Sequence, residues 1–370
     1  MEDLFKFRTG ISEHVACDLI RMIKNMPVAD SSSKEEYLNM IEKIFIRIFR
    51  IYDNWNTNIE LEKDDLKFLY KIDEQIPKSL YNNLGVGVSR MINTIRAGRD
   101  VKKDLSVALE CSEQNISLTR EEALKGNILY HYGDLDLDDL KGAEGLILPN
   151  EILCGDLSLE NLRNAQNLKL PERIDGSLIM NSLENARGIE FPRIVEGSLF
   201  LHDLKSVDGL KLPEKVGWNL YLEGLRNVEG LVLPKELGGI YFMWLESAKG
   251  LNLPKIMKGD LNLGMLRSSD DLILPKEVGG SLWLSDLVTA EGLELPKKIG
   301  GGLVLNRLVS TKGIKFPEEI GGNLNLEWLQ SAEDLVLPDD FDIDGRLYCD
   351  SEAVREEIMS MIGNNQSKRM

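Results

Sequence analysis

The chain has 370 residues, with 44 basic and 61 acidic side chains and a formal net charge of -17 at pH 7. Duplex nucleic acids and anionic membranes bind basic surfaces, so this charge argues against both as partners. Four cysteines without a pairing pattern predict reduced thiols and a cytoplasmic location, and the N-terminus lacks the form of a signal peptide. No apolar run is long enough to span a bilayer, and the length allows two or three domains.

Residues 1–125 are expected to form a bundle of helices. Ser12 is placed to cap a helix over residues 13–26, and Ser33 begins a capping box before a run of apolar residues at helical spacing that ends at Tyr52. Further helices are predicted over 63–76, 78–97 and 100–113, and Thr119 begins a second capping box. The width of the apolar stripe before Tyr52 favours a central place for that helix in a small bundle.

Two local patterns in this bundle allow other interpretations. His14 and Cys17 lie three residues apart on one helix, as a nucleophile and its base would, but a small apolar cysteine beside a surface histidine is preferred. Residues 54–65 carry oxygen-bearing side chains at calcium-loop spacing, yet Ile59 replaces the required glycine, so a polar loop is preferred. We therefore predict no catalytic residue, no metal site and no cofactor.

From Gly133 to Asp350 one phrase is repeated about ten times. Ten of the 12 prolines mark its beat, usually 21 residues apart: Pro149, Pro171, Pro192, Pro213, Pro234, Pro254, Pro275, Pro296, Pro317 and Pro338. A fixed period of this length predicts a solenoid, in which each turn buries its apolar side against its neighbours. Gly126 to Tyr132 would be the hinge into the first turn.

Counted from its proline, a turn has apolar residues at positions 4, 8, 10, 13, 16, 19 and 21. Leu-x-Leu occurs at positions 8–10 and 19–21, and we expect each to be a short strand because alternate residues share a face. Glycines at positions 5–6 and 18 are expected to allow positive φ at the corners. Ten turns stacked about 4.8 Å apart would make a rod roughly 50 Å long.

The phrase Leu-x-Leu-x-x-Leu, the Leu-Pro boundary and the period resemble the leucine-rich repeat family, in the form found in bacterial secreted effectors. The segment Ile-Gly-Gly-x-Leu-x-Leu also resembles receptor L domains. The chain departs from the family where a buried Asn or Cys should follow the Leu-x-Leu, because Leu stands there instead (Leu204, Leu225, Leu287 and Leu308). The resemblance implies binding through an exposed strand face and implies no chemistry.

The two ends of the solenoid carry their own signals. Asp134, Asp136, Asp138 and Asp139 form an acidic group on the first turn, which would either hold a cation or basic partner or, as we prefer, keep the solenoid edge solvated. The repeat decays after Pro338, and residues 351–362 are predicted to be a helix that covers the last turn. The expected organisation is a helical domain over 1–125, a solenoid over 126–350, and a cap helix with a disordered tail over 351–370.

The best functional signal is the row of residues between and after the first pair of leucines, which varies from turn to turn while the leucines do not. Large aromatic side chains on a rigid strand face are typical of interface anchors. The alternative is that the aromatic rings stack on one another as a ladder, or lie under the helical domain. The predicted partner-binding residues are Phe200, His202, Tyr221, Tyr241, Met243, Trp244, Trp283, Arg307 and Trp328.

The sequence thus predicts an α+β protein, with an N-terminal helical bundle, a leucine-rich-repeat-like β-solenoid of 21-residue turns and a C-terminal capping helix. Its expected function is recognition of a protein partner without catalysis. One alternative is a secreted bacterial effector enzyme, exported to a host cytosol, whose helical domain acts on what the solenoid holds. Another is a structural spacer with no partner. The partner's identity and the oligomeric state are left open.

Overall fold

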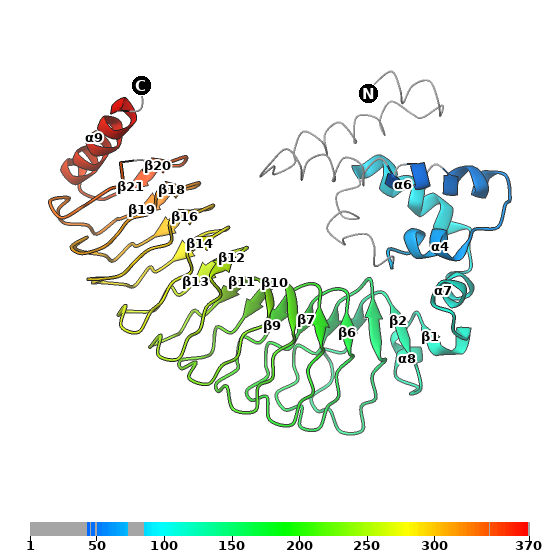
Figure 1. Ribbon diagram of the computed structural model, residues 1–370. Helices are drawn as coiled ribbons and strands as arrows, with labels where there is room; N and C mark the ends of the chain where they lie inside the picture. Colours follow the sequence, from blue (N-terminus) through cyan, green and yellow to red (C-terminus); the bar gives the residue numbers. More distant parts are fainter. Residues whose placement is uncertain (1–42, 45, 49, 73–84, 340, 369–370) are drawn as a thin grey trace, which may run out of the picture. The chain divides into compact units, whose positions relative to one another are not determined.

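The computed structural model describes residues 43–44, 46–48, 50–72, 85–339 and 341–368 (Figure 1). Contacts divide the chain into two units, Met1–Leu118 and Thr119–Met370. The described part of the first unit is mainly helical, and the second is a parallel β-solenoid of about ten turns followed by a helix. The predicted α+β class and the solenoid with a 21-residue period are confirmed.

The first unit contains helices whose ends follow local chemistry. Its elements are α4 (Lys63–Leu69), α6 (Gly85–Ala97), α7 (Val101–Leu109), the 3-10 helix η1 (Glu113–Asn115) and β1 (Ile116–Ser117). The Asp100 side chain caps α7 by accepting a hydrogen bond from the backbone N–H of Lys103, and Glu110 ends it in the left-handed region. The predicted helix over 13–26 and the first capping box lie outside the described residues. Within them, α4 and α7 are both shorter than predicted.

The second unit begins with α8 (Arg120–Ala123), where the Thr119 hydroxyl accepts from the N–H of Glu122 as its capping box predicts. Two short strands then occur in most turns, and their positions are assigned by strand pairing, because the turns that begin at Pro149 and Pro338 contain one or two extra residues. Strands at positions 3–4 are β2 (Tyr130–Tyr132), β4 (Glu151–Leu153), β6 (Arg173–Ile174), β8 (Ile194–Val195), β12 (Ile256–Met257), β14 (Glu277–Val278), β16 (Lys298–Ile299), β18 (Glu319–Ile320) and β20 (Asp342–Ile343). Strands at positions 8–9 are β3 (Leu135–Asp136), β5 (Leu157–Ser158), β7 (Leu178–Ile179), β9 (Leu199–Phe200), β13 (Leu261–Asn262), β15 (Leu282–Trp283), β17 (Leu303–Val304), β19 (Leu324–Asn325) and β21 (Leu347–Tyr348).

The middle of the solenoid breaks this regularity. In β10 (Lys215–Tyr221) and β11 (Glu236–Tyr241) the two short strands fuse into one. Their parallel register slips by one residue between Val216 and Asn219, which is a β-bulge, because the turn that starts at Pro234 has 20 residues instead of 21. Beyond this point the strands at positions 3–4 form a separate five-stranded sheet, β12-β14-β16-β18-β20.

The prediction of a second strand at positions 19–21 is wrong. In the described turns this segment makes only isolated bridges, such as Lys169–Glu190 and Glu294–Lys315. The bond from Leu295 N to Lys315 O on this side is 3.4 Å long, whereas the bond from Leu284 N to Val304 O on the strand side is 2.9 Å. The solenoid bends so that its strands line the inner side of the arc (Figure 1). Turns diverge on the outer side, which weakens any ladder there.

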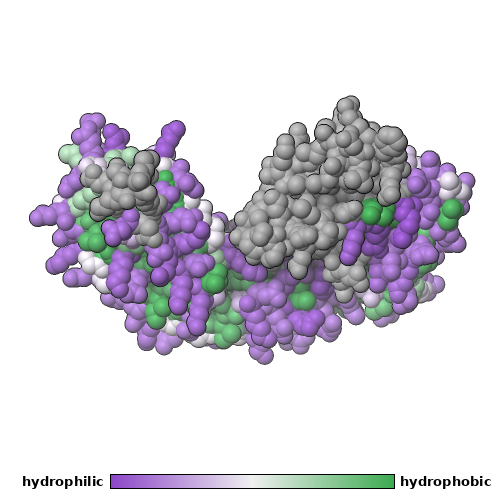
Figure 2. Space-filling model, turned by 45° about the horizontal axis from the view of Figure 1, so that its top comes forward, coloured by the Kyte–Doolittle hydropathy of each residue, from purple (hydrophilic) through white to green (hydrophobic). Residues whose placement is uncertain are grey.

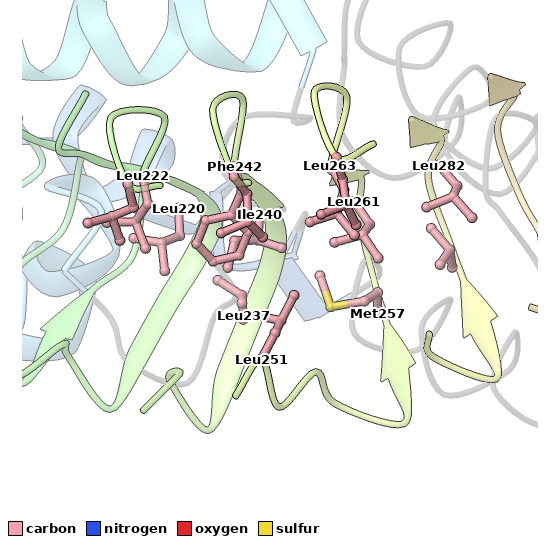
Figure 3. Packing of buried hydrophobic residues seen from close by; sticks show 14 of the residues in the cluster. Leu220, Leu222, Leu237, Ile240, Phe242, Leu251, Met257, Leu261, Leu263 and Leu282 are labelled. Atoms are coloured by element: carbon pink, nitrogen blue, oxygen red, sulfur yellow. The ribbon is translucent and has the colours of Figure 1, made fainter. Parts of the chain in front are cut away.

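The core is a stack of equivalent apolar residues from successive turns. Leu220, Ile240, Leu261 and Leu282 occupy the same place in four consecutive turns, and each is fully buried. Figure 3 shows these side chains in rows along the solenoid axis. Each buried leucine contributes roughly 1.5–3 kcal/mol, so neighbouring turns hold one another without disulfides or metal.

The Gly-Gly pairs at positions 5–6 serve a different purpose from the one expected, because none of them has positive φ. Gly300 shows the reason: a Cβ there would lie 2.2 Å from the carbonyl oxygen of Gly279 in the preceding turn. The backbones approach so closely that no side chain fits. The glycines at position 18 do have positive φ, for example Gly292 at 79°, as predicted.

A ladder of short polar side chains at position 7 connects the turns. Asp156 Oδ1 accepts from Ser177 N at 2.6 Å, Ser177 Oγ accepts from Ser198 N at 3.1 Å, and Ser198 Oγ accepts from Asn219 N at 3.3 Å. The same arrangement recurs from Ser281 N to Asp260 Oδ1 and from Gly302 N to Ser281 Oγ. Side chains therefore bond the backbone of the next turn here, away from the position where the leucine-rich repeat family has its asparagine.

The last turn is covered by α9 (Glu352–Lys368), and the predicted cap helix is confirmed, though it is longer than expected. Val354, Ile358 and Ile362 are buried at helical spacing and belong to the solenoid core. Across the described part of the chain, none of the helices has the length and apolar character needed to cross a membrane.

Replacing Gly300 with Ala should lower the free energy of unfolding by roughly 1–3 kcal/mol, because the new Cβ collides with the Gly279 carbonyl of the turn beneath. Urea unfolding followed by tryptophan fluorescence measures this change. Gly142→Ala is the control, since a Cβ there meets nothing within 4 Å. Equal stability of the two variants would contradict the close approach.

Replacing Thr311 with Val should raise the free energy of unfolding by about 1 kcal/mol, because the buried Thr311 hydroxyl has no hydrogen-bond partner among the described residues. The equivalent position holds Ala in neighbouring turns, such as Ala290 and Ala332. The comparison variant is Ser310→Ala, which should lower the free energy of unfolding because Ser310 Oγ accepts a hydrogen bond from the N–H of Lys312. A loss of stability in the Thr311→Val variant would show that the hydroxyl is satisfied.

Candidate protein-interaction face

Parallel register brings the predicted partner-binding residues onto one side of the solenoid. Phe200 pairs with Tyr221, Tyr221 with Tyr241, and Asn262 with Trp283. The apolar residues on either side of each of these residues point inward and are fully buried; they are leucines except beside Tyr241, where Ile240 and Phe242 take their place. We call the outward residues at positions 7, 9, 11 and 12, counted by this register, the strand face.

Four aromatic rings follow one another along the strand face, three of them stacked and the fourth, of Trp283, tilted. The ring centroids of Phe200 and Tyr221 are 4.6 Å apart with planes 5° apart, and those of Tyr221 and Tyr241 are 4.7 Å apart. Trp283 lies 6.2 Å from Tyr241, across the turn that carries Asn262. This aromatic ladder is the arrangement weighed above as the alternative to an interface. Its rings use their faces on each other and present edges and hydroxyls outward.

The tyrosine hydroxyls of the aromatic ladder are held by neighbouring polar groups. Tyr241 OH donates to Asp260 Oδ2 at 2.6 Å, and Asn219 Nδ2 donates to Tyr221 OH at 3.2 Å. Burial raises the pKa of Tyr241, and its hydrogen bond to the Asp260 carboxylate raises it further. Tyr241 is therefore a neutral donor at physiological pH, with a fixed orientation.

His202 stands edge-on to two rings of this ladder. Its ring centroid is 5.8 Å from that of Phe200 and 5.6 Å from that of Tyr221, with planes 73° and 76° apart. In the described part of the chain, its Nε2 atom is buried and has no hydrogen-bond partner. His202 thus packs as an aromatic side chain and leaves one polar atom unsatisfied.

Three further predicted residues are well exposed. Met243 is 40% exposed, Trp244 50% and Trp328 51%. The Arg307 guanidinium lies over the Trp328 ring, 5.1 Å from its centroid, and its Nη1 is 3.6 Å from Asp286 Oδ1. The structure therefore places the nine predicted residues on one face, stacked in part and exposed in part. Their role in binding stays a prediction.

Trp218 is a large exposed residue that the sequence analysis did not include among the predicted partner-binding residues. Trp218 is 58% exposed and lies in the bulge of β10, where neighbouring turns carry glycine, for example Gly197. Two sequence signals pointed to it: tryptophan in a glycine column, and the shortened turn that follows. Bulges often turn a side chain outward near functional sites.

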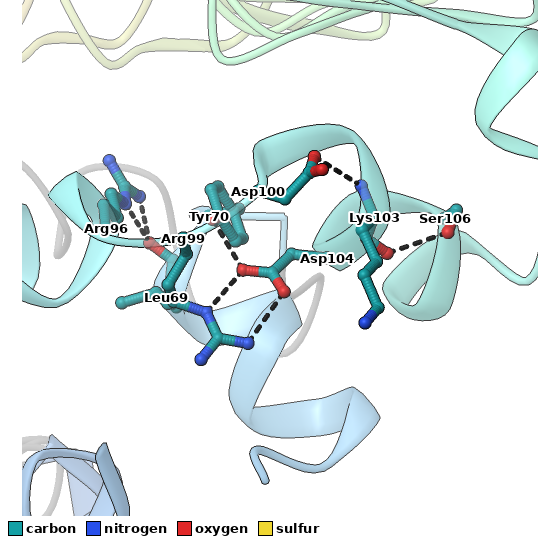
Figure 4. Close-up of polar contacts among 8 residues, drawn as sticks. All are labelled: Leu69, Tyr70, Arg96, Arg99, Asp100, Lys103, Asp104 and Ser106. Atoms are coloured by element: carbon teal, nitrogen blue, oxygen red, sulfur yellow. Dashed lines mark hydrogen bonds and ion pairs between the residues drawn. The ribbon is translucent and has the colours of Figure 1, made fainter. Parts of the chain in front are cut away.

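The polar patterns of the first unit form no open site in the described residues. Tyr70 OH donates to Asp104 Oδ2 at 2.8 Å, and Arg99 binds both oxygens of that carboxylate at 2.5 and 2.7 Å (Figure 4). Burial and the bond to Asp104 raise the pKa of Tyr70. Arg96 donates to the carbonyl of Leu69. These groups bond one another and hold α4, α6 and α7 together.

The remaining alternatives concern His14 and Cys17, the calcium-loop spacing and the acidic group of the first turn. His14 and Cys17 lie outside the described residues. The calcium-loop interpretation is wrong, because Asn54 and Asn56 lie in a helix and the Asp65 carboxylate is bound by Arg50. In the acidic group of the first turn, Asp134 Oδ1 accepts from Asp156 N, Asp136 Oδ1 accepts from Asp138 N, and Asp139 pairs with Arg120.

Comparison of the chain with protein-family models, with curated proteins and with solved structures finds no match. The leucine-rich repeat resemblance therefore rests on the repeat itself.

Replacing Asp104 with Asn should lower the free energy of unfolding by about 2 kcal/mol, since it breaks a bidentate ion pair and leaves the half-buried Arg99 guanidinium without its counter-charge. Thermal unfolding monitored by circular dichroism measures the loss. Glu113→Gln removes an exposed carboxylate from the same unit and should have no effect. An Asp104→Asn variant as stable as wild type would mean that the cluster does not support the helices.

Proposed function

We propose that this protein recognises a protein partner through the strand face of its solenoid, without catalysis. The observation that carries this proposal is the pairing of a rigid aromatic ladder with exposed large side chains beside it, namely Met243, Trp244 and Trp328. Interfaces gain most of their affinity from a few such anchors. We further propose that the solenoid is a variant of the leucine-rich repeat, a fold that binds through its strand side.

Rigidity supports this role. The exposed side chains lie in turns that directly follow strands hydrogen-bonded on both sides, and the aromatic ladder is fixed by stacking. Because this surface is already ordered, binding of a partner costs little conformational entropy on the side of this protein. Figure 2 shows hydrophobic residues as small separate patches among hydrophilic ones, a mixture typical of non-obligate interfaces.

We propose a cytoplasmic place of action, without a nucleic-acid or membrane partner. The enzyme alternative needs polar groups that converge on a cleft in the helical domain. The main polar cluster among the described residues of that unit is engaged internally around Asp104, so no specific observation favours that alternative.

The test is a selection of peptides from a random phage-display library on the immobilised full chain. Changing Met243 and Trp244 together to Ser should lower the affinity for the selected peptides by roughly 30-fold. This is the loss expected when an anchor that contributes about 2 kcal/mol is removed. Binding is measured by fluorescence anisotropy.

The matched control changes Val232 and Ile273 to Ser. These side chains are 79% and 78% exposed at position 20, outside the strand face, so their loss removes a comparable apolar surface. The control should bind as wild type does. Selected peptides that bind the Met243/Trp244 variant as tightly as wild type would refute the proposal.

A further inference from the structure

Charge is distributed unequally between the strand face and the other sides of the solenoid. Twelve acidic side chains lie on the strand face, against two basic ones, Arg307 and Arg346. The acidic residues are Asp134, Asp136, Asp138, Asp139, Asp156, Glu160, Asp203, Glu223, Asp260, Asp286, Glu327 and Asp350. All of them are at least partly exposed.

Many acidic residues away from the strand face pair with a cation from the adjacent turn. Asp208 pairs with Arg187 at 3.0 Å, and equivalent pairs join Glu246 to Arg226, Glu294 to Lys315, Glu318 to Lys297 and Glu319 to Lys298. On the strand face only Asp139 and Asp286 form an ion pair within the described part of the chain. The repeat thus stacks opposite charges at many places elsewhere, whereas ten of the strand-face carboxylates have no ion-pairing cation among the described residues.

Trp244 and Trp328 occupy the same place in their turns, and the equivalent residue in the preceding turn differs between them. Both backbone N–H groups donate to the equivalent carbonyl of the preceding turn, of Glu223 and of Asn306 respectively. Arg307 precedes Trp328 by one turn and lies over its ring. The residue at that place before Trp244 is Gly224, which has no side chain to cover the indole.

We propose that the strand face binds an arginine-rich extended segment of a partner protein, with one guanidinium over Trp244 in the place that Arg307 takes on Trp328. This inference rests on the proposed function and names the chemistry of the partner. The nearby carboxylates of Asp203 and Glu223, which form no ion pair among the described residues, supply the counter-charge. A second copy of this chain would present carboxylates to carboxylates and be repelled.

The dimensions suit a short peptide. Glu160, Asp203, Glu223 and Trp244 span four steps between turns, about 19 Å at 4.8 Å per step, which about six extended residues cover. Arginine is favoured over lysine because its planar guanidinium stacks on aromatic faces while donating to carboxylates.

The probe is a fluorescein-labelled peptide of eight residues, four of them arginine, titrated against the full chain and measured by anisotropy. Matched probes carry lysine, glutamine or glutamate in place of arginine. We expect the arginine probe to bind most tightly and its affinity to fall as salt is raised, because exposed charges are screened. The variant with Glu160→Gln, Asp203→Asn and Glu223→Gln should bind it about tenfold more weakly.

Two controls locate the site. Glu144→Gln, Glu291→Gln and Glu333→Gln remove the same charge from exposed positions off the strand face and should leave binding unchanged. Trp244→Leu should weaken the arginine probe about fivefold, whereas Trp328→Leu, whose ring face is already covered by Arg307, should not.

Any of three other results would overturn the inference. Equal weakening by both triple variants would show that overall charge attracts the probe without a site. A glutamine or glutamate probe that binds as tightly as the arginine probe would show that positive charge is not what the strand face recognises. The proposed function would still hold if the variant with Met243→Ser and Trp244→Ser binds that probe more weakly than wild type. Failure of all four probes to bind overturns the arginine-rich partner, and the library selection then judges the strand face separately.

Discussion

The solenoid depends on parallel pairing between successive turns, which places each strand residue about 4.8 Å from its equivalent in the next turn. A side chain on this framework must tolerate a neighbour of its own kind. Leucines therefore stack as rows in the core, and glycines mark the places where the backbone of one turn meets that of another. Serine and aspartate at position 7 bond the next turn's N–H, because that N–H lies within reach of a short side chain.

The same constraint explains the outer surface. Opposite charges on adjacent turns fall within ion-pair distance, and many such pairs lie away from the strand face. Each exposed pair contributes at most about 1 kcal/mol, so they act mainly by avoiding repulsion. On the strand face only two of the twelve acidic residues form an ion pair within the described part of the chain. The aromatic ladder crosses the shortened turn that begins at Pro234.

The turn that begins at Pro234 shows how a shorter turn is accommodated. Its 20-residue length goes with a register slip, and β10 and β11 are continuous strands across the corner. The slip leaves Trp218 outward in a column of glycines. The shortened spacing is visible in the sequence, but the direction in which Trp218 points depends on which neighbouring strand absorbs the extra residue.

The sequence by itself determined the period, the rows of buried leucines, the positive φ at Gly292 and its equivalents, and the side on which the aromatic residues gather, because each follows from local spacing. Tertiary structure decided the rest. It moved the second strand from positions 19–21 to positions 3–4, since the bend brings only the inner sides of the turns within ladder distance. It also decided which aromatic faces are used in stacking and which acids lack a cation, since both depend on the distance between turns and no single repeat contains that distance.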